Sequence, residues 1–514
     1  MEAGEKPMLR NCVVFSAVAA LMIFFCRADA QQPVSSQSAS TEEITVDAHA
    51  AATPFPHTWE EMFGSGRANL VMRAAYQHDL RMVQGITKFR YVRFHGILDD
   101  ENGVYSQNAQ GQPVYNWSYV DQIYDTLLAN GIRPFVEISF MPKLLAAHLD
   151  YQSFWYHPIV SPPASYAKWD ALITAFARHL VERYGINEVS QWYFEVWNEP
   201  NIGFWTGKPA QATYFKLYDN TARALKAVSP RLRVGGPATA QAAWVGDMIA
   251  HAVRDHVPLD FVSSHAYGDD SAIDVFHDHR YVAPHQMVCA AIEKVHEEIL
   301  HSARPDTPLI WSEFNASYAN HQDITDSIYM GPWLADTISK CASMTKMMSY
   351  WTFSDVFEEQ GVIKTPFYGG FGLVAEDGIP KPSFDAFMLL HELGNERLAA
   401  PVNEAIVTRR ADGTLVIAAW NLVEPGVQGS DKTVVFNFKG IGNDAWATIR
   451  RVDAEHGDVL AAWKKMGSPK YPTPQQVHAL RQAAEVGPPQ DVPIHDQRLT
   501  IVVPPMGLAV MEIR

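Results

Sequence analysis

Between residues 60 and 395, short apolar runs alternate with stretches of helical spacing, and this alternation constrains the fold of the chain most. The interiors of the short runs are continuously apolar, which is typical of strands buried on both faces of a parallel sheet. We count eight of them. The predicted strands lie near Met62 and at 91–97, 133–141, 191–200, 232–239, 261–268, 308–315 and 348–355.

The stretches between these strands carry apolar residues at helical intervals. One stripe runs from Val120 to Leu128 and is ended by Asn130-Gly131. Eight strands that alternate with helices close into a (β/α)₈ barrel, or TIM barrel. An open doubly wound sheet is the alternative, but no Gly-x-Gly-x-x-Gly motif follows the first strand. We therefore predict an α/β fold with this barrel at 53–395.

After residue 395 the pattern changes to short strands separated by turn signals such as Asp412-Gly413. This pattern favours an antiparallel β-sandwich at 396–514. Residues 31–52 are interpreted as a flexible lead-in, in which the run 44–48 could add a strand to the sandwich. The sandwich strands are expected at 405–410, 414–421, 432–438, 447–453 and 499–505.

The N-terminus has the features of a secretory signal at 1–30. An apolar run at 13–25 follows Lys6 and Arg10, and Ala28-Asp29-Ala30 supplies a cleavage pattern. Thirteen apolar residues are too few to span a hydrocarbon layer of ~30 Å as a helix. We expect a secreted or periplasmic protein without stable membrane association after cleavage.

The net charge of −16 and the absence of a basic tract argue against nucleic acid as a partner. Cys12 and Cys26 lie in the signal, which leaves Cys289 and Cys341. These two are either buried free thiols or one disulfide, and their spacing suits no metal site. The oligomeric state is not predicted.

Polar residues gather at the C-terminal ends of the predicted strands, which is where a (β/α)₈ barrel carries its active site. A lone strand-end His or Glu is most often structural, but several that converge on one rim indicate a site. The residues are His95, Asn198, Glu199, His265, Tyr267, Glu313, Ser354 and Asp355, with Glu358 and Glu359 just beyond.

Two of these carboxylates, Glu199 and Glu313, end strands four and seven, which face each other across a barrel. Cleavage of a glycosidic bond needs such a pair, one carboxyl to protonate the leaving oxygen and one ionised to attack or to activate water. Glu195 lies inside its strand, so we expect it to point into the barrel and pair with a polar neighbour. Asn198 could donate to a sugar hydroxyl.

Six blocks of this sequence, in order, resemble glycoside hydrolase family 39. The Asn-Glu-Pro signature occurs across a whole clan of retaining glycosidases, but the ordered set is highly specific. The blocks are GSGRA (64–68), YVRFHGIL (91–98), WYFEVWNEPNIGFW (192–205), SSHAYG (263–268), WSEFNAS (311–317) and YWTFSDVFEE (350–359).

The resemblance implies roles for individual residues. It makes Glu199 the acid/base and Glu313 the nucleophile of a retaining double displacement. It also implies that either Glu358 or Glu359 contacts the sugar, and the sequence leaves open which of the two does so. The other expected sugar contacts are His95, Asn198, His265, Tyr267 and Trp351.

The family divides mainly into β-xylosidases and α-L-iduronidases. Iduronidases place a Lys two residues after the strand-six His, where this chain has Tyr267, and residues 352–380 contain no Arg. A neutral pentoside therefore fits better than an anionic sugar. The long aromatic loops at 142–163 and 356–379 could close one end of a cleft or form a stacking floor for a polymer.

We therefore predict an exo-glycosidase that releases terminal β-D-xylose from xylo-oligosaccharides. The alternatives are an endo-acting enzyme, or one that cleaves arabinosides or glucosides. A non-catalytic carbohydrate-binding protein is disfavoured because both carboxylates are present. No His-Glu-x-x-His pattern appears, so we expect neither a metal nor a cofactor.

Overall fold

The computed structural model describes residues 40–400 and 402–514 of the 514-residue chain. The predicted signal at 1–30 and residues 31–39 of the predicted lead-in lie outside these described residues. Within them, no helix combines the length and the apolar character needed to cross a bilayer.

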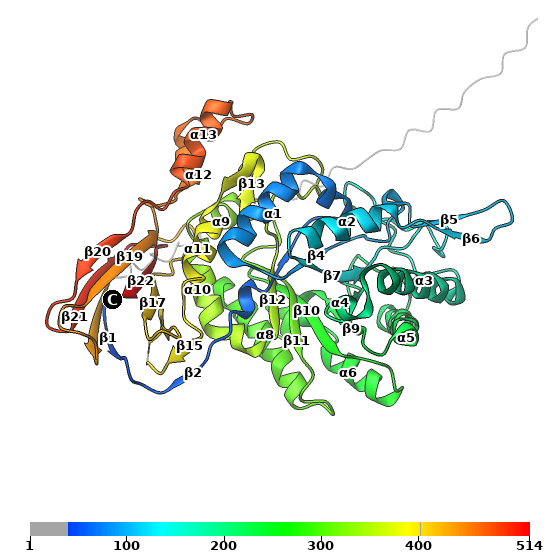
Figure 1. Ribbon diagram of the computed structural model, residues 1–514, viewed down its shortest axis with the longest axis horizontal. Coiled ribbons are helices and arrows are strands. Elements are labelled where there is room, and N and C mark those ends of the chain that lie inside the picture. The colour runs from blue at the N-terminus through cyan, green and yellow to red at the C-terminus, as the bar shows by residue number, and fades with distance from the viewer. Residues whose placement is uncertain (1–39, 401) are drawn as a thin grey trace, which may run out of the picture. The chain divides into compact units, whose positions relative to one another are not determined.

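Eight parallel strands form a closed barrel, and helices surround it (Figure 1). All eight predicted barrel strands are present, and the predicted (β/α)₈ fold is confirmed. The strands are β3 (Met62–Gly64), β4 (Tyr91–Phe94), β7 (Arg133–Ile138), β8 (Tyr193–Val196), β9 (Arg233–Thr239), β10 (Phe261–Tyr267), β11 (Leu309–Asn315) and β12 (Met347–Tyr350).

Helices connect successive barrel strands. The predicted stripe from Val120 forms the buried face of α2, and Gly131 continues the chain with a positive φ of 73°. The helices are α1 (Ala74–Thr87), α2 (Ser118–Ala129), α3 (Tyr166–Tyr184), α4 (Ile186–Val189), α5 (Ala210–Val228), α6 (Val245–Arg254), α7 (Ala272–Phe276), α8 (Pro284–Leu300), α9 (Gln322–Thr325), α10 (Met330–Cys341) and α11 (Pro382–Leu390). Two small hairpins, β5 (Tyr105–Gln107) with β6 (Pro113–Tyr115) and β13 (Val374–Ala375) with β14 (Ile379–Pro380), lie in the loops.

The interior of the barrel changes from apolar to charged along the strands. Side chains alternate between the two faces of a strand, so the inward residue after an apolar one lies two positions further on. The inward residue that follows the apolar one is Arg93 in β4, Glu137 in β7 and Glu195 in β8, and all three are fully buried. The apolar layer below them consists of Met62, Tyr91, Phe135, Tyr193, Phe261, Ile310 and Met347.

Strand β11 carries a bulge close to the C-terminal rim. Its register with β10 shifts so that Ser264 pairs with Trp311 but His265 pairs with Glu313. Ser312 is the extra residue, and its Oγ lies 3.1 Å from Nε2 of His265. Ser312 and Glu313 therefore both face the interior, which strict alternation along the strand would not allow.

The C-terminal region is the predicted β-sandwich. Its larger sheet has the order β2-β15-β16-β17-β22-β19-β20, and its smaller sheet has the order β1-β18-β21. One apolar cluster contains residues of both sheets, so the sheets pack face to face. The strands are β1 (Ser40–Asp47), β2 (Ala52–Pro54), β15 (Glu396–Leu398), β16 (Ala405–Arg409), β17 (Leu415–Trp420), β18 (Lys432–Lys439), β19 (Trp446–Val452), β20 (Gln490–Pro493), β21 (Arg498–Val503) and β22 (Leu508–Ile513).

The sandwich differs from the sequence prediction in three respects. Strand β1 covers residues 44–47 of the predicted run 44–48. It pairs with β18 in parallel, which is possible because the two strands lie far apart in sequence and are not joined by a tight hairpin. Four further strands were not predicted, namely β2, β15, β20 and β22. Because β1 and the start of β2 lie at 40–52, the described part of the predicted flexible lead-in is ordered. The helices α12 (Val459–Lys465) and α13 (Pro474–Ala483) were also missed.

The barrel and the sandwich share one continuous apolar core. Val452 and Leu508 of the sandwich belong to the same cluster of buried residues as the barrel helices. At Gly331 of α10, an added Cβ would lie 3.3 Å from Cβ of Leu508, so the absence of a side chain permits this contact.

Among the helices around the barrel, Cys289 of α8 and Cys341 of α10 form a disulfide, which decides between the two alternatives left open by the sequence.

Candidate active site

The turn after β8 brings Glu199 to the rim of the barrel. The backbone of Trp197 and Glu199 has positive φ values of 72° and 43°, which are uncommon for residues with side chains. The Glu199 N–H donates to the carbonyl of Ala238, at the end of the next strand, with a distance of 2.8 Å. This contact holds the carboxyl group at the mouth of the barrel.

Glu313 lies opposite and is buried. Its Oε1 accepts a hydrogen bond of 2.6 Å from Nη1 of Arg93, and its Oε2 accepts one of 2.6 Å from the hydroxyl of Tyr267. Both contacts fix the orientation of this carboxylate, and the one from Arg93 is charge-assisted.

Arg93 supplies the positive charge of the site and is fully buried. Burial alone would lower the pKa of its guanidinium, but the carboxylates of Glu195, Glu137 and Glu313 hold that pKa above its ordinary value. Its contacts to these carboxylates measure 2.6, 2.8 and 2.6 Å in that order, and its Nη2 also donates to Asn198. Glu195 is thus paired inside the barrel, as the sequence predicted.

Glu199 has a different environment from Glu313. Burial raises the pKa of Glu199 well above its ordinary value, and the negative charge of Glu313 raises it further. One oxygen of each carboxylate lies within 4.8 Å of the other. The site therefore places a carboxyl whose protonated form is favoured next to one that contacts a guanidinium, and such a pair can act as acid and nucleophile.

His265 lies beneath the two carboxylates. Its Nδ1 lies 3.0 Å from Oε1 of Glu199 and 3.7 Å from Oε1 of Glu313. Burial lowers the pKa of His265 well below its ordinary value, and the charge of Arg93 lowers it further, so the ring is neutral. His265 contacts Glu199 and is not among the residues that line the cavity, and its contact with the sugar stays a prediction.

A cavity of about 310 Å³ opens above the carboxylates. Its walls combine aromatic faces with carboxyl and amide groups, a composition suited to a sugar ring with polar edges and apolar faces. The lining residues are His95, Phe154, Asn198, Glu199, Ile202, Phe204, Ala240, Gln241, Tyr267, Asp270, Glu313, Tyr318, Trp351, Glu359, Gln360 and Phe371.

The structure separates Glu358 from Glu359. Glu359 lines the cavity and lies 3.6 Å from Nε2 of His95, and its Oε1 has no hydrogen-bond partner among the described residues. Glu358 instead forms ion pairs with Arg67 and Arg73. The lining of the cavity therefore favours Glu359 for the predicted sugar contact, since the carboxylate of Glu358 is paired with two arginines.

The predicted residue Trp351 packs its ring against β3. A Cβ added at Gly64 would lie 2.2 Å from the Trp351 ring, so only glycine fits at this position. The ring centroid of Trp351 lies 4.9 Å from that of His95. Gly64 thus allows Trp351 to form one wall of the cavity.

Four site residues were missed by the sequence analysis. Arg93 and Glu137 could have been found, because charged residues at inward positions of buried strands stand out. Gln241 and Asp270 follow strands β9 and β10 without a recognisable motif. Asp270 accepts a hydrogen bond from the Tyr267 N–H, and burial raises its pKa to about 7.

Two groups among the described residues bring three possible metal ligands within 4.8 Å of one another. The first is Glu199, His265 and Glu313, in which Glu313 already accepts hydrogen bonds from Arg93 and Tyr267. The second is His57, Glu60 and His391, which lies outside the cavity.

The C-terminal rim of this (β/α)₈ barrel carries two buried carboxyls, one of which has its protonated form favoured by burial. This is the arrangement of a glycoside hydrolase. The family model for glycosyl hydrolases family 39 matches residues 42–496. The chain belongs to this family.

Individual relatives agree with the family. A β-xylosidase from Geobacillus stearothermophilus is 39% identical over 84% of this chain and 86% of its own length. An α-L-iduronidase from Mus musculus is 22% identical over 84% of this chain and 72% of its own length. The crystal structure of a monomeric β-xylosidase from Caulobacter crescentus is similar with a TM-score of 0.84 and 33% identity, and the match covers 92% of this chain and 99% of the other.

Proposed function

We propose that this glycoside hydrolase is a retaining exo-β-xylosidase, which releases terminal β-D-xylose from xylo-oligosaccharides by double displacement. The observation that carries the proposal is the short distance between the carboxylates, whose nearest oxygens lie within 4.8 Å. Retaining glycosidases have carboxyl groups about 5–5.5 Å apart, whereas inverting enzymes need about 6.5–9.5 Å to admit a water.

In the first step, the carboxylate of Glu313 attacks the anomeric carbon of the terminal xylose. The glycosidic bond breaks, and the carboxyl proton of Glu199 moves to the leaving oxygen. The products of this step are a covalent xylosyl ester on Glu313 and a free shorter oligosaccharide.

In the second step, Glu199 is ionised and takes a proton from an incoming water. The water oxygen attacks the anomeric carbon and displaces Glu313, which leaves as a carboxylate. Two inversions give β-xylose, and both carboxyl groups return to their starting states. The negative charge on Glu313 disappears in the covalent intermediate, and the pKa of Glu199 falls as a result, which suits its role as a base.

The sugar is proposed to be uncharged because the cavity offers no cation. No Lys or Arg occurs among the described residues that line it. A resemblance to iduronidases would require Lys where this chain has Tyr267, and the hydroxyl of Tyr267 donates to Glu313. The higher identity to the β-xylosidase than to the iduronidase supports the same choice.

Exo action is supported by the two aromatic loops that the sequence singled out. The Trp155 N–H donates to the carbonyl of Glu359 with a distance of 2.8 Å, so the two loops are joined. Phe154 of one loop and Phe371 of the other both line the cavity. We propose that these loops close one end of the site and leave room for a chain end.

We also propose that the protein is secreted or periplasmic. The signal features at 1–30 support this, and the disulfide between Cys289 and Cys341 fits an oxidising compartment.

The test is a hydrolysis panel of aryl β-D-xyloside, α-L-arabinoside, β-D-glucoside and α-L-iduronide, together with xylobiose and xylan. We expect the xyloside and xylobiose to be the preferred substrates, and NMR to show β-xylose as the first product. Early appearance of α-xylose would contradict retention. Faster hydrolysis of xylan than of xylobiose would favour the endo-acting alternative.

A further inference from the structure

Two histidine rings converge on one carboxylate at the face of the barrel opposite to the cavity. Glu60 ends the 3₁₀ helix η1 (Thr58–Glu60), which precedes the first barrel strand, and His391 follows the last helix of the barrel, α11. Both positions lie at the N-terminal ends of the strands, whereas the active site lies at the C-terminal ends.

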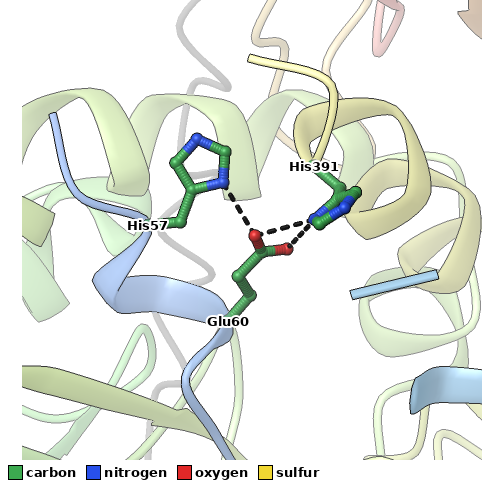
Figure 2. Close-up of side chains that lie close together, drawn as sticks. All are labelled: His57, Glu60 and His391. Atoms are coloured by element: carbon green, nitrogen blue, oxygen red, sulfur yellow. Dashed lines mark hydrogen bonds and ion pairs between the residues drawn. The ribbon is translucent and has the colours of Figure 1, made fainter. Parts of the chain in front are cut away.

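The contacts within this group are short and share one acceptor. Nδ1 of His57 lies 2.7 Å from Oε1 of Glu60. Nδ1 of His391 lies 2.8 Å from the same oxygen and 3.0 Å from Oε2. Figure 2 shows the two rings on either side of the carboxylate, both with a nitrogen turned towards it.

The carboxylate lacks a permanent counter-charge. Glu60 is 5% exposed, and within residues 40–400 and 402–514 its ion pairs are only those with the two rings. A buried carboxylate costs free energy unless it is paired with a positive charge, and neutral imidazoles do not supply one.

We propose that His57, Glu60 and His391 form a zinc-binding site that joins the segment before the barrel to the end of its last helix. Two imidazole nitrogens and one carboxylate oxygen are a known donor set for Zn²⁺. The nitrogen–oxygen distances between the rings and Glu60 are now 2.7–3.0 Å. They need to increase only to about 3.3 Å, the separation of two ligand atoms around a tetrahedral zinc ion.

The surroundings allow this change. The side chain of His391 is 30% exposed, which gives the ion an entry path and leaves a position for a water as the fourth ligand. The ring of His57 is stacked on Trp59 with a centroid distance of 4.3 Å, which fixes its plane. Nε2 of His57 has no hydrogen-bond partner among the described residues, so its tautomer is free to follow a ligand at Nδ1.

The ligands are separated by up to 334 positions, and for this reason the sequence showed no metal motif. They link the segment that precedes the barrel in the sequence to the segment that follows it, since Glu60 precedes β3 and His391 follows α11. Bound zinc would stabilise the folded state, because the unfolded chain does not hold the three ligands together.

The test uses full-length protein that is stripped with EDTA, incubated with ZnCl₂ and passed over a desalting column. We expect one zinc per chain and a rise in Tm of about 2–4 °C at zinc concentrations near 100 times Kd. His391→Ala and His391→Asn should retain no zinc and show no rise. Activity towards aryl xyloside at low zinc should be unchanged in both variants, because the group lies far from the cavity.

Two control variants separate this site from others. His285→Ala removes the ring of a two-residue pair with Glu424 and should still retain one zinc. Glu313→Gln removes a ligand of the group in the active site and should also retain one. The proposal is wrong if wild-type protein retains no zinc, or if the zinc is lost in Glu313→Gln and kept in His391→Ala.

Discussion

Arg93 donates to Glu313 across 2.6 Å inside the barrel, and neither side chain is more than 5% exposed. The same guanidinium contacts two further buried carboxylates, Glu137 and Glu195. Among the described residues, Glu199 forms an ion pair only with His265 and none with an arginine or a lysine. One arginine therefore gives the two catalytic candidates different electrostatic surroundings.

Glu313→Ala should reduce kcat by at least about 10³-fold, because covalent catalysis depends on this carboxylate. Added azide should restore part of the rate on an aryl xyloside and yield the azide of inverted configuration. Circular dichroism serves as the control for folding. A residual rate above about 1% of wild type would mean that another group is the nucleophile.

Glu199→Ala should discriminate between leaving groups. Xylobiose needs a proton on its leaving oxygen and should lose most of its rate, whereas an activated aryl xyloside should still form the covalent intermediate and show a burst. Equal losses on both substrates would show that Glu199 only binds sugar.

The pH profile should also report Glu199. Its pKa is raised well above the ordinary 4.5, and the first step needs the protonated form. The rate constant kcat/KM should therefore fall as pH rises through this raised pKa, and this basic limb should be absent for an activated substrate in Glu199→Ala. A basic limb that persists unchanged in the variant would assign it to a different group.

Glu358 and Glu359 are adjacent in sequence and form a matched pair. Glu359→Ala should raise KM and lower kcat, because a carboxylate that lines the cavity with an unpartnered oxygen is lost. Glu358→Ala should affect mainly Tm, because it breaks ion pairs with Arg67 and Arg73. The reverse pattern in steady-state kinetics and thermal melts would contradict the assignment of the sugar contact.

Reduction of the disulfide between Cys289 and Cys341 should lower the free energy of unfolding. The cysteines are separated by 52 positions, and a loop of this size corresponds to about 4 kcal/mol in the chain-entropy model. Urea unfolding with and without a reductant measures the effect. The double variant Cys289→Ser/Cys341→Ser should not respond to the reductant, and an equal response would show that the reductant acts elsewhere.

The order of elements was predictable because each barrel strand is an apolar run followed by a helical stripe. The catalytic carboxylates were predictable because they stand at strand ends within a recognisable motif. The choice of Glu359 over Glu358 was not, because a loop has no periodicity that indicates which side chain turns inward. Gln241 and Asp270 were missed for the same reason.

In the sandwich, β22 is apolar except for Glu512 and β20 has only four residues, so neither shows the alternation that marks a half-buried strand. The group of His57, Glu60 and His391 depends on a contact between segments 331 residues apart. Such contacts arise from tertiary packing and leave no local pattern.

The bulge in β11 bears on how barrels of this kind acquire new chemistry. Trp311 and Phe314 keep their places in the apolar layer under the helices, while Ser312 and Glu313 both reach the interior. One additional residue near the end of a strand thus adds a functional group inside without altering the surface on which the helices pack. Insertions at such points offer an evolving or engineered barrel a way to enlarge its catalytic repertoire while its outer scaffold stays the same.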